Sequence, residues 1–391
     1  MTKNWPQNKT FCAAPWTVHC INASGTAGLC CVNNLYNVPV SKHRQFFEGD
    51  QLQEIKLKML AGEQVKGCEK CYDNEAVDIY SLRQCYNDNT ADALDIDRLS
   101  DRDYENHIWY DLSLSNLCNQ KCRICGPNNS TAWVKDAKAM SDLPWAHPNY
   151  RLNTVLIEND AEIDHIIESM QKSTEDFRIE LKGGEPLYID TNVSLLDRMV
   201  KLGLHERTRE LRIITNGTQY KTKIIELISR FPAIDLALSI DAIGKLHEYT
   251  RGTNINWDEC RRSWQKLINL PNIKKFRISN TIYAYTVLGI PDLIDWVKSE
   301  FGNHIGMSNS MLHKPKYLRA ELVPIDLRLL TLDRIGHDHR LGKSLGSQSK
   351  EDSEIIEENL RRFRIFTQRL DEIRGENLIN LVPQLAGIMQ K

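Results

Sequence analysis

Cys118, Cys122 and Cys125 share the short stretch "LCNQKCRIC" with the spacing CxxxCxxC. Three thiolates on one loop leave a tetrahedral zinc ion one ligand short. They can instead hold three irons of a 4Fe–4S cluster and leave the fourth iron open. On spacing alone, a fragment of a zinc ribbon is the alternative. The sequence therefore predicts a metal centre on this loop.

A second group of cysteines lies near the start of the chain. Cys12 and Cys30 flank the turn "NASG", and "GCEKC" supplies Cys68 and Cys71. Gly25 in that turn can adopt the positive φ angle of a tight hairpin, so we expect Cys12 and Cys30 to approach each other. Four cysteines in two groups describe either a structural zinc site or an iron–sulfur site. We expect Cys31 and Cys260 to pack as small apolar side chains. Cys20 and Cys85 are expected to pack or to lie beside the ligands, and either is the alternative to one of the four.

From residue 107 onwards, short β runs alternate with amphipathic helical stretches. The runs are "IWYDLSLS", "FRIELKGG", "LRIITNG", "IDLALSID", "FRISNTIY" and "IGMSNSM". This alternation predicts a parallel sheet, open or closed into a partial barrel. Segment 128–176 is long enough for two helices, and no strand alternation persists after residue 311. A last helix is expected from a cap at Ser353 to Gly375.

Glycine and polar residues follow several of these runs, at the strand ends where barrel active sites lie. The second run leads into "GGEP", the third ends in "TNG", the fourth in "SID", and "YTRG" follows further on. The candidate binding residues in these motifs are Gly183, Gly184, Glu185, Asn216, Ser239, Asp241 and Arg251. Taken singly, each motif is also explained by an ordinary turn, and Arg251 by a surface ion pair.

In this order, the motifs resemble the signature of the radical S-adenosylmethionine (SAM) superfamily over about residues 107–310. The resemblance implies a partial (β/α)6 barrel and a 4Fe–4S cluster bound by the three cysteines of the CxxxCxxC loop. It also implies SAM contacts from the "GGEP" turn to the amino group and from Arg251 to the carboxylate. Asn216, Ser239 and Asp241 would face the ribose. Ile124 stands where the superfamily often has an aromatic residue.

In this superfamily, an electron from the reduced cluster cleaves SAM, and the resulting 5′-deoxyadenosyl radical abstracts hydrogen from a substrate C–H bond. The resemblance thus implies an oxidoreductase or modifying enzyme acting on a peptide or a small molecule. A flavodoxin- or ferredoxin-type protein would be its electron donor. The residues identify no catalytic acid or base. The alternative is a non-catalytic iron–sulfur electron carrier or a zinc-stabilised scaffold.

The N-terminal cysteines follow the pattern C-x12-G-x4-C and then C-x2-C. This pattern resembles the twitch, or half-SPASM, module of certain radical SAM enzymes. The resemblance implies that Cys12, Cys30, Cys68 and Cys71 bind one auxiliary 4Fe–4S cluster. Twitch modules usually follow the core, whereas this one precedes it.

The length of 391 residues indicates more than one domain. We expect a twitch-like α+β domain with an acidic linker over 1–100, the radical SAM core over 101–310, and a mainly helical extension over 311–391. With 50 basic and 52 acidic residues, the net charge of -2 favours neither nucleic acid nor anionic lipid. The longest apolar runs are too short for a membrane span, and the first residues show no export signal, so a cytoplasmic protein is expected.

Overall fold

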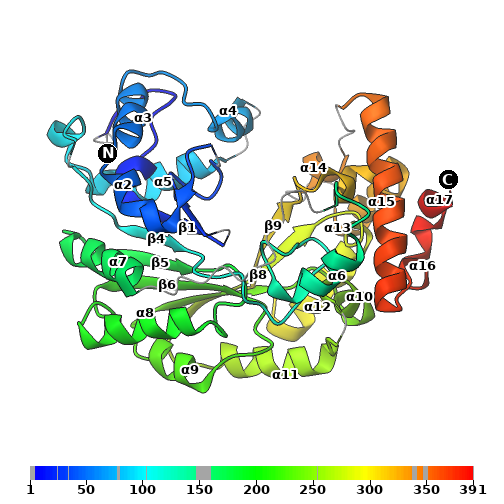
Figure 1. Cartoon of the computed structure of the whole chain (residues 1–391). Helices are drawn as coiled ribbons and strands as arrows, with labels where there is room; N and C mark the ends of the chain where they lie inside the picture. Colours follow the sequence, from blue (N-terminus) through cyan, green and yellow to red (C-terminus); the bar gives the residue numbers. More distant parts are fainter. Residues whose placement is uncertain are drawn as a thin grey trace.

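The computed structural model describes residues 5–390 except 24, 34, 77–79, 103, 147–159, 253, 337–340 and 347–350. Its centre is one nine-stranded sheet in the order β3-β2-β1-β4-β5-β6-β7-β8-β9. The strands from β1 through β4 to β9 pair in parallel. Figure 1 shows this sheet between an N-terminal lobe, in blue, and the C-terminal helices, in orange and red. The predicted α/β class with a parallel sheet is confirmed.

Each of the six predicted β runs forms one strand of the core. They are β4 (Trp109–Leu112), β5 (Phe177–Leu181), β6 (Thr208–Thr215), β7 (Ile234–Ser239), β8 (Ile273–Ile282) and β9 (Gly306–Met311). Side chains alternate between the two faces of a strand, so Phe177, Ile179 and Leu181 of β5 all point the same way. That face is buried in the main hydrophobic core.

Helices cover this apolar face of the sheet. They are α7 (Asp160–Lys172), α8 (Asp190–Lys201), α9 (Thr222–Ile228), α11 (Trp257–Ile268) and α12 (Ile290–Phe301). Helix α10 (Gly244–Arg251) instead places Tyr249 in a second hydrophobic core. Apolar residues spaced three or four apart, such as Leu195 and Met199 of α8, pack on the strands. Figure 1 shows α8, α9 and α11 along one side of the sheet. The segment after β4 contains α6 (Val134–Ala139) and α7, the two helices that its length predicts.

The N-terminal lobe joins the same sheet instead of forming one of its own. Strand β1 (Val18–Asn22) pairs antiparallel with β2 (Thr26–Gly28), which pairs with β3 (Val38–Pro39). Gly25 has a φ of 74°, as predicted for the turn, whereas Ser24 lies outside the described residues. The other edge of β1 pairs in parallel with β4, so the sheet continues across the boundary expected at residue 100.

Short helices complete the lobe: α1 (Ala14–Thr17), α2 (His43–Phe47), α3 (Asp50–Leu60), α4 (Glu69–Ala76) and α5 (Leu82–Thr90). The acidic segment after α5 differs from the expected linker. It forms two 3-10 turns, and its apolar residues Leu94, Leu99 and Tyr104 are buried beside Trp16. The indole nitrogen of Trp16 donates to the Leu99 carbonyl at 3.1 Å. Composition misled here because Leu94, Leu99 and Tyr104 are buried in the lobe, and of the large apolar residues only Ile96 is exposed.

The C-terminal part is helical, as predicted, and no described residue after Met311 lies in a strand. Its helices are α13 (Ile325–Ile335), α14 (Gly342–Gly346), α15 (Ser353–Arg374), α16 (Leu378–Leu381) and α17 (Ala386–Met389). Helix α15 begins at Ser353 with Asp352 as its cap residue, so the cap prediction is off by one position. Gly375 ends α15 with a φ of 65°, as predicted.

Helix α15 packs into the second hydrophobic core. Phe363, Phe366 and Leu370 lie there with Trp133, which stands just before α6. This core attaches the C-terminal extension to the segment that follows the cysteine loop. Within the described residues, no helix combines the length and the apolar character needed to cross a membrane.

Candidate functional site

The CxxxCxxC loop follows β4, and its backbone is held by two neighbouring segments. The Arg123 amide donates to the Thr250 carbonyl of α10 at 2.8 Å. The Trp133 indole nitrogen donates to the Cys122 carbonyl at 2.7 Å. Cys122 is buried, and Cys118 and Cys125 are half-buried. Three sulfur atoms therefore gather on a fixed loop at the carboxyl end of the first core strand.

Hydrogen bonds and charge favour a thiolate at Cys122. A hydrogen bond from Cys125 lowers the pKa of Cys122, and the nearby charge of Arg251 lowers it further. The Arg251 Nη1 atom lies 3.8 Å from the Cys122 sulfur. Burial raises the pKa of Cys118 to about 12, and the charge of Cys122 contributes. Thiolates are the form of cysteine that binds metal. Cys122 is therefore the cysteine of this loop most suited to bind a metal, with the guanidinium of Arg251 beside its sulfur.

Arg251 and Asp241, two of the predicted SAM-binding residues, form a buried ion pair next to this loop. Their Nη2 and Oδ2 atoms are 2.8 Å apart. The other carboxylate oxygen of Asp241 accepts from the Thr281 amide at 2.8 Å. The alternative of a surface ion pair for Arg251 is wrong, because both side chains are buried. The pair joins the ends of β7, β8 and α10 beside Cys122.

The glycines of "GGEP" allow the turn after β5 to approach the cysteine loop. Gly183 and Gly184 have positive φ angles of 80° and 55°. A Cβ on Gly183 would lie 2.6 Å from the Ser113 Cβ, and one on Gly184 would lie 2.3 Å from the Leu117 carbonyl oxygen. Leu117 directly precedes Cys118. Within the described residues, a side chain at either glycine would therefore collide with the segment that leads from β4 into the cysteine loop.

Glu185 joins the ends of two core strands. Its buried carboxylate accepts hydrogen bonds from the Thr215 hydroxyl, the Leu187 amide at 3.1 Å and the Asn216 amide at 2.8 Å. Its own amide donates to the Leu117 carbonyl at 2.8 Å. Burial raises the pKa of Glu185 to about 7. Glu185 thereby holds the turn after β5, the end of β6 and the start of the cysteine loop together.

Asn216 connects this arrangement to the loop through residues that the sequence did not single out. Its side-chain nitrogen donates to the side-chain oxygen Oδ1 of Asn119 at 2.8 Å and lies 4.0 Å from the Cys118 sulfur. Asn119 in turn donates to the Thr218 hydroxyl at 2.9 Å. The only feature of the sequence that could have indicated a role for Asn119 is its position between Cys118 and Cys122. Ser239 lies half-buried at the end of β7, in register with Ser279 of β8.

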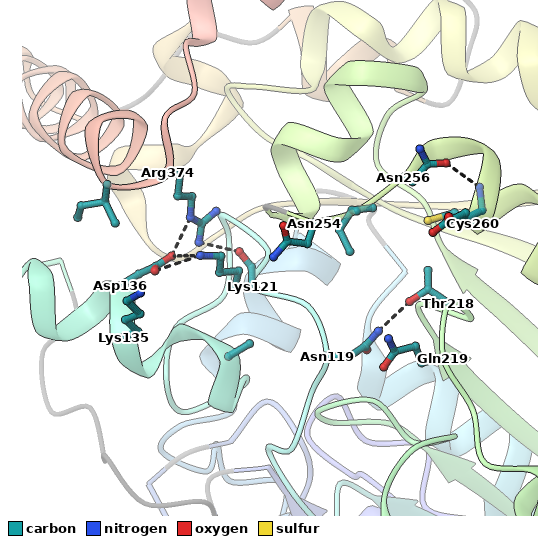
Figure 2. A pocket seen from close by; sticks show the side chains of 14 residues that line it. Asn119, Lys121, Lys135, Asp136, Thr218, Gln219, Asn254, Asn256, Cys260 and Arg374 are labelled. Atoms are coloured by element: carbon teal, nitrogen blue, oxygen red, sulfur yellow. Dashed lines mark hydrogen bonds and ion pairs between the residues drawn. The ribbon is translucent and has the colours of Figure 1, made fainter.

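A pocket of about 610 Å³ lies beside the cysteine loop (Figure 2). Asn119 and Lys121 line it, whereas Cys118, Cys122 and Cys125 do not. On its wall, Asp136 of α6 binds Lys121 at 3.0 Å and Arg374 of α15 at 2.8 Å. Arg374 also donates to the Lys121 carbonyl at 2.8 Å. The C-terminal extension thus braces the loop, a role that nothing in the sequence indicated.

Charged side chains line the face of the sheet opposite the main core. The pairs are Lys182–Asp111 at 2.7 Å, Lys182–Glu180 at 3.1 Å, Arg212–Asp235 at 2.8 Å and Arg277–Asp235 at 2.5 Å. Cys20 and Cys31 lie close to the Asp111 and Lys182 charges. These two cysteines therefore face the charged row.

The N-terminal cysteines predicted to act together do come together. Cys12 precedes α1, Cys30 follows β2, and Cys68 and Cys71 stand at the start of α4. Burial raises the pKa of Cys12, and so do the charges of the other three sulfurs. Asn33, which the sequence did not single out, links the two halves. Its amide donates to the Cys30 sulfur at 3.4 Å, and its side-chain nitrogen donates to the Cys68 sulfur at 3.4 Å.

The spacing of the sulfur atoms bears on the kind of metal. Tetrahedral zinc, with Zn–S bonds of about 2.3 Å, holds its sulfurs only about 3.8 Å apart, whereas a 4Fe–4S cube separates them more widely. Among the described residues, the groups of three metal-ligating atoms within 4.8 Å of one another include none of these cysteines. Four cysteine thiols are a donor set that both a structural zinc ion and a 4Fe–4S cluster use.

No family model matches the chain, and no curated protein matches it either. Among solved structures, anSMEcpe with bound AdoMet is 14% identical, with a TM-score of 0.43, over 60% of this chain and 62% of that one. SuiB of Streptococcus suis bound to S-adenosylmethionine is 14% identical, with a TM-score of 0.40, over 73% and 64% of the two chains. SuiB bound to precursor peptide SuiA is 14% identical, with a TM-score of 0.34, over 85% and 68%. The chain spans 56% of anSMEcpe in its complex with AdoMet and the Cp18Cys peptide.

Proposed function

We propose that this chain is a radical SAM enzyme with one auxiliary 4Fe–4S cluster, acting on a peptide or a polar small molecule. The observation that carries the proposal is the loop after β4. It gathers three cysteine sulfurs beside a buried Arg251–Asp241 pair. Three cysteines leave one iron of a cluster free for a further ligand.

The residues around the loop support this proposal by fixing its shape. Glu185 and the two glycines before it bind the Leu117 end of the loop to the ends of β5 and β6. Arg123 and Arg374 anchor its other side to α10, α6 and α15. A rigid loop holds its ligands in place without reorganisation when a cofactor binds.

The charges near Cys122 suit an anionic cofactor group. Arg251 is buried, paired with Asp241 and 3.8 Å from the Cys122 sulfur, so it can neutralise a thiolate or orient a carboxylate. We propose that Arg251 orients the carboxylate of SAM. Ser239 and Asn216, at neighbouring strand ends, are the proposed ribose contacts. When bound, the cluster and SAM together supply a 5′-deoxyadenosyl radical for hydrogen abstraction, and the residues here orient SAM and exclude water.

The proposed auxiliary cluster is bound by Cys12, Cys30, Cys68 and Cys71. Its support is the convergence of these four sulfurs, with Asn33 donating to two of them. The paired charges on the face of the sheet opposite the main core favour a polar substrate over an apolar one. We propose a flavodoxin- or ferredoxin-type electron donor, with the protein inside the cell.

Anaerobic purification followed by iron, sulfide and zinc analysis tests the proposal. Two clusters predict about eight irons per chain. Replacing Cys118, Cys122 and Cys125 by Ala should leave about four, and replacing Cys68 and Cys71 should also leave about four. Cys260→Ala is the matched control, because Cys260 packs into the main core, and it should keep all eight. Zinc in place of iron at these cysteines would instead indicate a zinc-stabilised scaffold.

A further inference from the structure

Three histidines from distant parts of the chain meet on the helix-covered side of the sheet. His19 lies in β1, His43 begins α2 and His165 lies in α7. One nitrogen from each lies within 4.8 Å of the other two. Among the described residues, these three histidines form the group of metal-ligating side chains whose ligand atoms all lie within that distance. None of the three belongs to a motif used in the proposed function.

His19 is the most unusual member, because it is fully buried and neither ring nitrogen has a hydrogen-bond partner in the protein. A buried polar atom without a partner costs about 1–3 kcal/mol. Such atoms are rare in folded proteins, and an ion or a water at the site is the usual reason for them. Both nitrogens of His19 are therefore available to a ligand at the place where His43 and His165 also meet.

His43 is arranged as a metal-ligating histidine is. Its Nδ1 atom bonds to the Val40 carbonyl, which can only accept, so Nδ1 carries the proton. The lone pair is then on Nε2, which is buried and has no partner in the protein. Metal-binding histidines commonly donate their second nitrogen to a backbone carbonyl in this way, which fixes the tautomer.

All three imidazoles are neutral near pH 7, the form that binds metal. Burial lowers the pKa of His19, His43 and His165, the last to about 3. The nearby charge of Arg44 also lowers the pKa of His165. Arg44 is paired with Glu168 at 2.6 Å, so its repulsion of a bound cation is partly compensated.

Aromatic packing explains part of this cluster. The His19 ring lies 4.6 Å from Phe47, 5.7 Å from Tyr110 and 5.3 Å from His107. His107 is a separate case, because its Nδ1 atom bonds to the Ser169 hydroxyl at 2.9 Å. Packing accounts for the positions of the rings but leaves both ring nitrogens of His19 and the Nε2 atom of His43 without hydrogen-bond partners in the protein.

We propose that His19, His43 and His165 bind a zinc ion, with a water or hydroxide in the fourth position. Neutral imidazole suits zinc, and three histidines with one open position are an established zinc arrangement. Bond lengths of about 2.0 Å would draw the three nitrogens to about 3.3 Å from one another. His165 is half-buried, so the site is nearest to solvent at this residue. The site joins the N-terminal hairpin to α7 of the core.

The test is zinc binding by the full-length protein, with the ligands identified by zinc X-ray absorption. Because the cysteines can also take up zinc, the readout is the nitrogen shell at about 2.0 Å, as opposed to sulfur at about 2.3 Å. We expect one nitrogen-ligated zinc per chain in the wild type. His165→Ala should weaken its binding at least about 100-fold, since even indirect partners of a metal ligand contribute roughly 10- to 100-fold. His304→Ala, on an exposed histidine, should bind zinc as the wild type does.

A stability measurement guards against a variant that folds poorly. Zinc should raise the melting temperature of the wild type and of His304→Ala by more than that of His165→Ala or His165→Gln, which keep only the cysteine sites. Two results would overturn the proposal. One is a wild type with no nitrogen-ligated zinc, which would assign the open nitrogens to water. The other is an equal nitrogen shell and affinity in the His165 variants.

Discussion

Glu185 illustrates, at the scale of single residues, how a predicted binding residue can be needed for the fold. Its carboxylate accepts two backbone amides and a hydroxyl at the junction of β5 and β6. At pH 5.5, below its pKa of about 7, Glu185 is the neutral acid, and both of its oxygens can still accept; glutamine has one acceptor oxygen and presents its NH2 to donors. We expect Glu185→Gln to lower the free energy of unfolding by about 1–3 kcal/mol at pH 5.5, measured by urea denaturation.

The cost of Glu185→Gln should also depend on pH. Burial raises the folded-state pKa of Glu185 to about 7, whereas a free glutamate has about 4.3. A raised pKa stabilises the fold fully below the unfolded value, and this contribution is lost as the pH rises through 7. The advantage of the wild type should therefore shrink between pH 5.5 and 8. An advantage that stays constant or grows over this range, corrected with the exposed control Glu226→Gln, would contradict the assignment.

Arg251 and Asp241 are expected to depend on each other. Arg251→Ala leaves a buried carboxylate unpaired and should lower the free energy of unfolding by about 3–5 kcal/mol. The double variant Arg251→Ala with Asp241→Ala should lose less than the sum of the two single losses, because the residues are in contact. The exposed pair Arg334–Asp292 provides a control: Arg334→Ala should change stability by less than about 1 kcal/mol. Additive losses at Arg251 and Asp241 would argue against the pair.

At the scale of elements, the turn after β5 sets the position of the cysteine loop. Gly184 and Gly203 both have positive φ angles, 55° and 72°. A Cβ on Gly184 would meet the Leu117 carbonyl at 2.3 Å, whereas one on Gly203 would meet nothing within 4 Å. Gly203→Ala should cost only the backbone strain of about 1–2 kcal/mol. Gly184→Ala should cost about 1–3 kcal/mol more and reduce iron bound at Cys118, Cys122 and Cys125. Equal costs would contradict the contact.

The six core strands could be predicted because each is a short apolar run bounded by turn residues. The pairing of β1 with β4 could not, because strands of five and four residues carry no sequence record of a partner 90 residues away. The acidic segment after α5 was misjudged because its burial depends on three residues, Leu94, Leu99 and Tyr104. The cluster of His19, His43 and His165 could not be predicted either, because the three residues are far apart in the sequence and only the fold brings them together.

At the scale of the whole molecule, the N-terminal lobe and the core share one sheet. Strand β1 covers the edge of β4, where Trp109 and Tyr110 are buried. A chain restricted to 101–391 would expose that edge, and exposed edges with large apolar residues pair with other chains. We expect this fragment to aggregate when expressed alone and to stay monodisperse only with 1–100 present, as measured by size-exclusion chromatography. A monomeric fragment with the melting temperature of the full chain would contradict this expectation.

The central claim, that the loop after β4 supports SAM cleavage, is tested most directly by reductive incubation of the anaerobic full-length protein with SAM. We expect 5′-deoxyadenosine from the wild type and from Cys260→Ala, and none from the variant with Cys118, Cys122 and Cys125 replaced by Ala. No 5′-deoxyadenosine from a wild type that holds its full iron, with or without candidate peptides, would contradict the claim. So would equal amounts from the triple variant.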